Sequence, residues 1–181
     1  KRPAGAQTGS QLGARWAALG PEQRERAVVQ EVLRGNVPSN TFRLRPVDIR
    51  AVSRSGKPLQ GRIFVTPDYL SVGSDADYLR IPMRPSSATL IAGRLGYHLP
   101  TRKIVDEIYR SAQVKMSPYT IPPEKAMESV GWFVRHQKAV GRALPRSSVG
   151  KLIAGHKKDV VATNRILGRP NSVAIYGWHR G

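Results

Sequence analysis

The spacing of apolar residues changes twice along this chain, and that change constrains the fold more than any other feature. Residues 11–34 show helical intervals, interrupted at Gly20-Pro21. From Phe42 the interval becomes two, as in a strand, and helical spacing returns after Ser86. Helices and strands therefore occupy separate blocks rather than alternating. This arrangement predicts an α+β fold.

Turn-forming residues divide the period-two region into short strands. The turn at residues 53–58 separates one pair of strands and predicts a hairpin, and the turn at residues 73–77 separates a second pair. We expect a four-strand antiparallel region. Its strands are residues 47–51, 59–66, 69–72 and 78–83.

Capping residues mark the helices that follow. Gly96 ends a helix that begins at Ser86 or Ser87, and Thr101 caps the next one. The helices predicted in this part of the chain are residues 86–95, 102–112 and 124–140. The prediction is an antiparallel sheet of short strands with several packed helices and a helical N-terminus. A flexible arm, residues 1–10, precedes one domain, residues 11–181, whose helical N-terminal part is residues 11–40.

The chain is strongly basic. Its 181 residues include 30 Lys and Arg against 12 Asp and Glu, a net charge of +18. Such an excess attracts nucleic acid, anionic cell-wall polymer, acidic polysaccharide or a membrane surface, although solubility alone also explains a basic composition. No zinc finger, aromatic RNA-binding motif or recognition helix accompanies the charge, so nucleic-acid binding would be non-specific. The residues expected to hold an anionic substrate are Arg135, Lys138, Arg146, Lys151 and Trp178.

Two absences narrow the function classes. The chain has no cysteine, which excludes disulfides, thiolate zinc sites and cysteine nucleophiles. No apolar run approaches the ~18 residues of a membrane helix, and no apolar core of a signal peptide follows Lys1-Arg2-Pro3. We expect a secreted or cell-envelope protein whose signal has been removed, with a cytoplasmic location as the alternative.

Residues 152–179 hold the candidate chemistry. Two β-prone runs flank an Asn, Gly and Pro-rich turn. If Thr163 lies opposite Ser172, the register places His156 opposite His179, with Cβ atoms roughly 5 Å apart. Strand alternation then puts Lys158 on the side of His156, and Lys157 with Asp159 on the other face. A bulge at Gly155 would change this facing.

Three chemistries fit this cluster. His156, Asp159 and His179 form a ligand set for a divalent metal such as zinc, which would activate water for hydrolysis. Alternatively, one histidine acts as general base while Lys157 or Lys158 stabilises an oxyanion. In the third, a histidine and Tyr176 move a proton in lyase chemistry. The structural alternative is a hydrogen-bonded histidine, a surface Lys–Asp pair, and Tyr176 with Trp178 in the core.

Three weaker features complete the list of candidates. Residues 73–77 carry the alternating acids of a calcium loop without its later Gly and Glu, so an Asx turn is the preferred interpretation. His98 lies in a loop between helices and is expected to be structural. His136 is on a basic helix, where a surface position is favoured over one that reaches the site across a cleft.

Four segments resemble a group of bacterial proteins, often exported, that has no established activity. The segments are residues 65–77, 99–109, 155–161 and 173–179, so the resemblance spans roughly residues 60–179. It implies a location for the site rather than a reaction. It also implies that the chain continues beyond the Tyr-Gly-Trp-His segment.

The sequence therefore predicts a hydrolase that acts on an anionic or cell-envelope polymer. Its expected catalytic residues are His156, Lys157, Lys158, Asp159, Tyr176 and His179. The alternatives are a non-catalytic protein that binds polyanions, either nucleic acid or cell wall, and an acidic-polysaccharide lyase.

Overall fold

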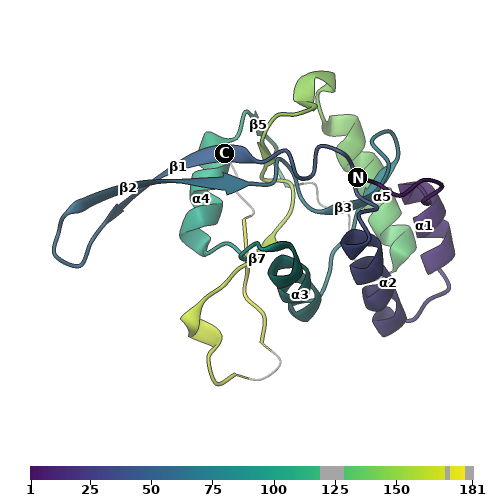
Figure 1. The fold of residues 1–181 in the computed structure, drawn as a ribbon, viewed down its shortest axis with the longest axis horizontal. Helices are drawn as coiled ribbons and strands as arrows, with labels where there is room; N and C mark the ends of the chain where they lie inside the picture. Colours follow the sequence, from purple (N-terminus) through teal and green to yellow (C-terminus); the bar gives the residue numbers. More distant parts are fainter. Residues whose placement is uncertain (119–128, 170–171, 178–181) are drawn as a thin grey trace.

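The computed structural model describes residues 1–118, 129–169 and 172–177, and it has the predicted α+β fold (Figure 1). The helices are α1 (Gly9–Trp16), α2 (Pro21–Leu33), α3 (Pro85–Leu95), α4 (Arg102–Ser111) and α5 (Val130–Ala143), with 3-10 turns η1 (Arg146–Ser148) and η2 (Asn164–Ile166). The strands are β1 (Arg45–Val52), β2 (Pro58–Val65), β3 (Ser71–Gly73), β4 (Tyr78–Arg80), β5 (Val114–Lys115), β6 (Ile153–Ala154), β7 (Asp159–Val160) and β8 (Ile175–Tyr176). No helix in the described ranges is long and apolar enough to cross a membrane.

The strands pair two by two within the described residues. β1 and β2 form the predicted hairpin, closed by a turn in which Gly56 has a φ of 78°. β3 and β4 form a second antiparallel pair, so the expected four-strand region is divided into two separate ladders. β5 and β6 pair in parallel, a long-range contact that the sequence pattern did not predict.

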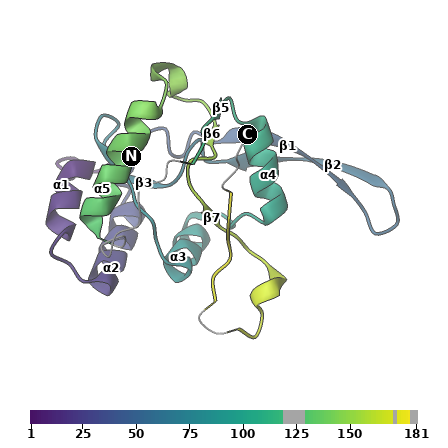
Figure 2. The same ribbon diagram turned by 180° about the vertical axis from the view of Figure 1, so that it is seen from behind.

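The buried apolar residues form two main cores and a smaller cluster. One core includes Leu12, Trp16 and Val72 and joins α1, α2, α3, α5 and the β3–β4 pair. The other core includes Val47 and Leu152 and joins α4 to the base of the β1–β2 hairpin and to β6. The smaller cluster joins α5 to β5 and β6 and consists of Val114, Met116, Val140 and Ile153. Figures 1 and 2 show α1, α2 and α5 grouped at one end, α4 with the hairpin at the other, and α3 between them.

The N-terminal segment, expected as an arm, makes specific hydrogen bonds. Arg2 Nε donates to Asn36 Oδ1 at 2.8 Å, and Gly9 N donates to Asp77 O at 2.8 Å. The acids of the predicted Asx turn have structural partners. Asp75 accepts from Ser39, and Asp77 accepts from the N–H and hydroxyl of Ser10. The two hydrogen bonds from Ser39 lower the pKa of Asp75, and the one from the Ser39 N–H has the larger effect.

The segment around β6 brings the site together. Ile153 N donates to Pro67 O at 2.8 Å on one side of β6, while Met116 N donates to Ala154 O at 2.9 Å on the other. Gly155 then turns the chain with a φ of 102°, and a Cβ there would lie 2.1 Å from Met116 O and 2.9 Å from Tyr109 Cε2. Only glycine fits this close approach.

The register predicted for the C-terminal hairpin is confirmed where the structure describes it. Asp159 pairs with Tyr176, and Val160 pairs with Ile175. In both pairs the residue numbers add up to 335, as they do for Thr163 and Ser172, so the register is the predicted one. His156 precedes β7 rather than continuing it, because Gly155 interrupts the extended chain.

We predict that Gly155→Ala lowers the free energy of unfolding by at least about 3 kcal/mol, because the added Cβ overlaps Met116 O and the residue keeps a left-handed φ. Gly96→Ala is the matched control, since Gly96 has a φ of 73° with no atom within 4 Å of its Cβ position. It should cost about 1–2 kcal/mol from the backbone alone. Urea unfolding of both variants measures the difference. Equal losses would contradict the close approach at Gly155.

Candidate functional site

A pocket of about 810 Å³ lies between the two cores. Its walls come from β2, α3, α4, one face of α5 and the chain around β6 and β7. Most of the lining is aliphatic or aromatic, while one part is polar. The residues of this polar part are Asp68, Tyr69, Arg80, His136, His156, Lys157, Lys158 and Asp159, while Thr66 and His98 line the pocket elsewhere.

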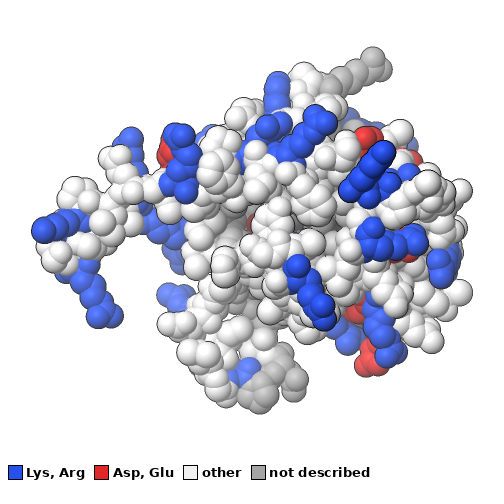
Figure 3. Space-filling model, viewed as in Figure 1, with Lys and Arg blue, Asp and Glu red and all other residues white. Residues whose placement is uncertain are grey.

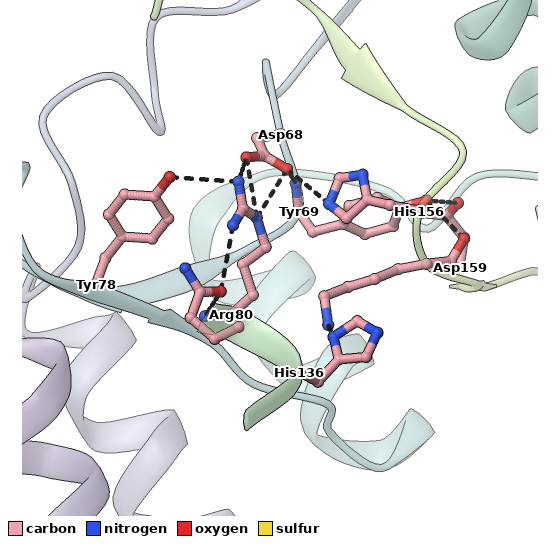
Figure 4. Close-up of polar contacts among 9 residues, drawn as sticks. Asp68, Tyr69, Tyr78, Arg80, His136, His156 and Asp159 are labelled. Carbon is pink, nitrogen blue, oxygen red and sulfur yellow. Dashed lines mark hydrogen bonds and ion pairs between the residues drawn. The ribbon is translucent and has the colours of Figure 1, made fainter. Parts of the chain in front are cut away.

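The polar part is built on a buried ion pair between Arg80 and Asp68 (Figure 4). The Arg80 side chain is 1% exposed. Its Nε lies 3.0 Å from Asp68 Oδ2, its Nη2 donates to the same carboxylate, and Nη1 donates to Gln137 Oε1 at 3.2 Å. Burial opposes the charge, but Asp68 and Tyr78 outweigh it and raise the pKa of Arg80. The pair fixes a positive charge inside the protein.

Tyr69 connects this ion pair to the chain before β7. Its hydroxyl donates to Lys157 O at 2.9 Å and lies 3.3 Å from Asp159 Oδ2. Its ring meets the His156 ring edge to face, with centroids 4.9 Å apart. Burial and the negative charge of Asp159 raise the pKa of Tyr69, so the hydroxyl remains a donor.

His156 is fully buried and lacks hydrogen-bond partners among the described residues. Neither ring nitrogen has a hydrogen bond to residues 1–118, 129–169 or 172–177, and Nε2 lies 3.6 Å from Asp68 Oδ1, beyond hydrogen-bond distance. Burial, with the charges of Arg80 and Lys157, lowers the pKa of His156 to about 2. The ring is therefore neutral at ordinary pH, and its contact with Asp68 is not an ion pair. A neutral ring has one donor and one acceptor nitrogen.

Lys157 meets His136 beside this ring. Its Nζ lies 3.2 Å from His136 Nδ1, and the His136 ring stacks on Trp132 with centroids 5.5 Å apart. Burial and the charge of Arg80 lower the pKa of Lys157 to about 8, although Asp68 acts in the other direction. The amine therefore exists in both protonation states near neutral pH.

The structure brings together three of the predicted catalytic residues. His156, Lys157 and Asp159 lie in the same pocket wall, and Lys158 lines the pocket with an exposed side chain. The predicted facing is wrong, since His156 and Lys157 both face the polar cluster instead of pointing to opposite sides. The turn at Gly155 is the reason, because it ends the alternation of side chains.

Tyr176 lies apart from this cluster. Its hydroxyl donates to Asp106 Oδ1 at 2.9 Å, and Arg102 lies over its ring, 5.4 Å from the centroid. This hydrogen bond to Asp106 is the main cause of the raised pKa of Tyr176. The lyase alternative needs Tyr176 beside a histidine; His179 lies outside the described residues, so this alternative stays a prediction.

His179 and Trp178 lie outside the described residues. Within residues 1–118, 129–169 and 172–177, no three His, Asp or Glu side chains are grouped to hold a metal ion. The metal set predicted from His156 and Asp159 depends on His179, and it stays a prediction.

Three of the predicted substrate-binding cations lie on the surface away from the pocket. Arg135, Lys138 and Lys151 are exposed, and none of them is among the described lining residues of the pocket. These three residues add to the surface charge. The backbone of Arg146 belongs to η1.

Sequence reasoning missed Asp68, Tyr69 and Arg80. In the sequence, Asp68 stands just before a short strand and Arg80 stands at the end of another. Charged residues in such positions are usually at the surface, so the sequence does not mark these two as buried. His136, expected at the surface, is 6% exposed. That expectation was wrong because the α5 face that carries His136 packs against the chain after β6.

Comparisons with known proteins give no family. The chain matches no protein-family model, and neither the curated proteins nor the solved structures include a match.

We predict that His156 makes the protein acid-sensitive. Its pKa is about 2 when folded against an ordinary value of 6.5, so the unfolded chain binds the extra proton below pH 6.5. Stability from this residue is complete above pH 6.5 and falls by about 1.4 kcal/mol per pH unit below it. The free energy of unfolding, measured with urea, should fall between pH 7 and pH 5. In His156→Phe this fall should be about 2 kcal/mol smaller than in the unaltered protein.

The control is His98→Phe, which replaces an exposed histidine and keeps His156. It should retain the full acid sensitivity. If His156→Phe loses as much stability at pH 5 as the unaltered protein does, His156 is not held neutral by burial.

Proposed function

We propose that the protein is a hydrolase whose reaction centre is the polar part of this pocket. The observation that carries the proposal is His156, a neutral, buried imidazole in the pocket wall whose nitrogens have no partner among the described residues. A buried polar group without a partner is costly, and such groups gather at functional sites. Lys157 and Arg80 add positive charge beside it.

We assign His156 the role of general base, and its pKa of about 2 makes it a weak one. Its unprotonated nitrogen accepts a proton from water as the water attacks the substrate. The ammonium of Lys157 faces the same space and stabilises the negative charge that develops on the substrate oxygen. Arg80 is held by Asp68, so it contributes a fixed positive potential.

The charge of the chain supports an anionic substrate. A net charge of +18 raises the local concentration of anions around the protein. Lys158 is exposed at the pocket and adds to this attraction. We propose an anionic component of the cell envelope as the substrate.

We predict that His156→Ala and Lys157→Met each lower hydrolysis by about 100-fold or more, because one removes the base and the other the oxyanion charge. The measurement is the release of soluble fragments from purified bacterial envelope, followed by mass spectrometry. Activity should fall as pH rises through about 8, where Lys157 loses its proton. Lys157→Arg should move that decline to higher pH, because arginine stays charged.

The matched control is Lys103→Met, which removes an exposed lysine on α4 outside the pocket lining. It should leave the rate unchanged. Release that is equal in the unaltered protein, His156→Ala and Lys157→Met would refute the proposed reaction centre.

A second candidate function rests on a different observation, the β1–β2 hairpin. The hairpin projects from the body of the protein, and Figure 3 shows Lys and Arg side chains along it. Arg50, Arg54 and Lys57 are exposed there, while Arg62 pairs with Asp48 at 2.6 Å. A basic projection of this kind fits non-catalytic binding of a polyanion.

For this candidate we predict weaker and less salt-dependent binding to duplex DNA when Arg50, Arg54 and Lys57 are all changed to Gln. Each lost phosphate contact lowers the slope of log K against log salt by about 0.9, so the triple variant should lose about 2–3. A control triple variant changes Arg26, Arg94 and Lys103, which are exposed elsewhere. Equal slopes for the two triple variants would show that net charge, and not the hairpin, binds the polyanion.

A further inference from the structure

The apolar part of the pocket is larger than the proposed chemistry requires. At about 810 Å³ the pocket is near the upper end of the range for small-molecule sites, which is roughly 300–1,000 Å³. Its walls hold side chains from β2, α3 and α4 that face one another across the space. The apolar lining includes Phe42, Ile63, Met83, Leu95, Ile104 and Ile108.

Two groups in the polar part of the same pocket lack an expected partner among the described residues. Lys157 Nζ lies 3.2 Å from His136 Nδ1, but no carboxylate of the described residues lies within ion-pair distance of it. His156 is 1% exposed, and neither of its nitrogens has a hydrogen-bond partner in the described part of the chain. A cation without a carboxylate and an imidazole without a hydrogen bond, at the end of an apolar pocket, indicate what a ligand would supply.

We propose that the pocket binds an amphiphilic carboxylate, with its hydrocarbon chain among α3, α4 and β2 and its carboxylate at Lys157 and His156. The inference rests on the proposed function for its location, since both use the polar part of the pocket. It goes further in naming the class of ligand, an acyl chain that ends in a carboxylate.

A carboxylate fits these donors better than other head groups. One oxygen accepts from the Lys157 ammonium, and the same or the second oxygen accepts from the N–H of neutral His156. Asp68 is already committed to Arg80, and Asp159 lies 3.3 Å from the Tyr69 hydroxyl. A carboxylate therefore gives Lys157 a direct ion pair, which none of the described carboxylates makes with it. A quaternary ammonium head would instead meet the ammonium of Lys157 and be repelled.

The pocket wall offers a matched pair of variants for the hydrocarbon chain. Ala92 lines the pocket, whereas Leu90 lies on the same helix, is 47% exposed and does not line it. By calorimetry with dodecanoate, Ala92→Trp should weaken binding at least tenfold and Leu90→Trp should not change it. Ile104→Trp on α4, with Lys103→Trp as its exposed control, repeats the comparison on the facing wall. If Ala92→Trp fails to fold, the comparison of Ile104→Trp with Lys103→Trp still tests whether the hydrocarbon chain lies in the pocket.

The length of the chain gives an independent readout. From hexanoate to dodecanoate, affinity should rise about fourfold for each methylene, the equivalent of about 0.8 kcal/mol, as buried apolar surface increases. Dodecyltrimethylammonium has the same chain with the opposite charge and should bind at least tenfold more weakly. Equal binding of the two would overturn the assignment of the carboxylate.

The head group is tested at Lys157. Lys157→Met should weaken dodecanoate binding tenfold to a hundredfold, the effect of losing a charge-assisted hydrogen bond. Near pH 8.5 the unaltered protein should take up protons on binding, seen as a dependence of the heat on the buffer, because the carboxylate favours charged Lys157. Lys157→Met should show no uptake. Uptake that persists in the variant would overturn this position for the head group.

Binding and turnover separate the two proposals. Dodecanoate has no bond to hydrolyse, so its binding does not depend on catalysis. If it binds with the expected variant pattern while envelope is not cleaved, the hydrolase proposal fails and the ligand class stands. If envelope is cleaved through His156 but Ala92→Trp and Ile104→Trp bind dodecanoate as the unaltered protein does, the ligand class fails alone.

Discussion

The ion pair between Arg80 and Asp68 is the interaction on which the rest of the site depends. It joins the chain after β2, the end of β4 and, through Gln137, the helix α5. A guanidinium that is 1% exposed cannot lose its carboxylate cheaply, since an uncompensated buried charge costs about 3–5 kcal/mol. These three segments are therefore held in one arrangement, and the pocket wall that they form is fixed before any ligand enters.

The same fixed charge sets the state of its neighbours. Arg80 opposes protonation of both His156 and Lys157, and burial acts in the same direction on each. The histidine remains neutral, and the lysine is close to losing its proton. A neutral His156 and a Lys157 with a lowered pKa thus lie side by side, because the charge of Arg80, paired with Asp68, is close to both. Without Arg80, the pKa of His156 and the pKa of Lys157 would both be lowered less.

The local structure was predictable and the site was not, for a physical reason. The β1–β2 hairpin, the helix ending at Gly96 and the cap at Thr101 depend on neighbouring residues, and the pattern of the sequence contains that information. Asp68, Arg80, His136 and His156 meet only because β6 inserts between Pro67 and β5, a parallel contact between distant segments. The positive φ at Gly155 then directs both His156 and Lys157 into the pocket, which no rule of alternation anticipates.

The surface charge acts on a ligand at a distance, and the pocket acts on it only at contact. The charge can therefore attract many anions, while the pocket determines which of them fits. The +18 charge, with the basic hairpin, draws any anion toward the protein and is screened beyond about 8–10 Å in salt. It does not distinguish an acyl anion from a polysaccharide or a nucleic acid. The apolar walls act only on contact, and they favour a ligand with a hydrocarbon portion. A ligand that suits both the long-range charge and the lining combines an anionic head with an apolar body, and the ligand that we propose is therefore an amphiphile rather than a fully charged polymer.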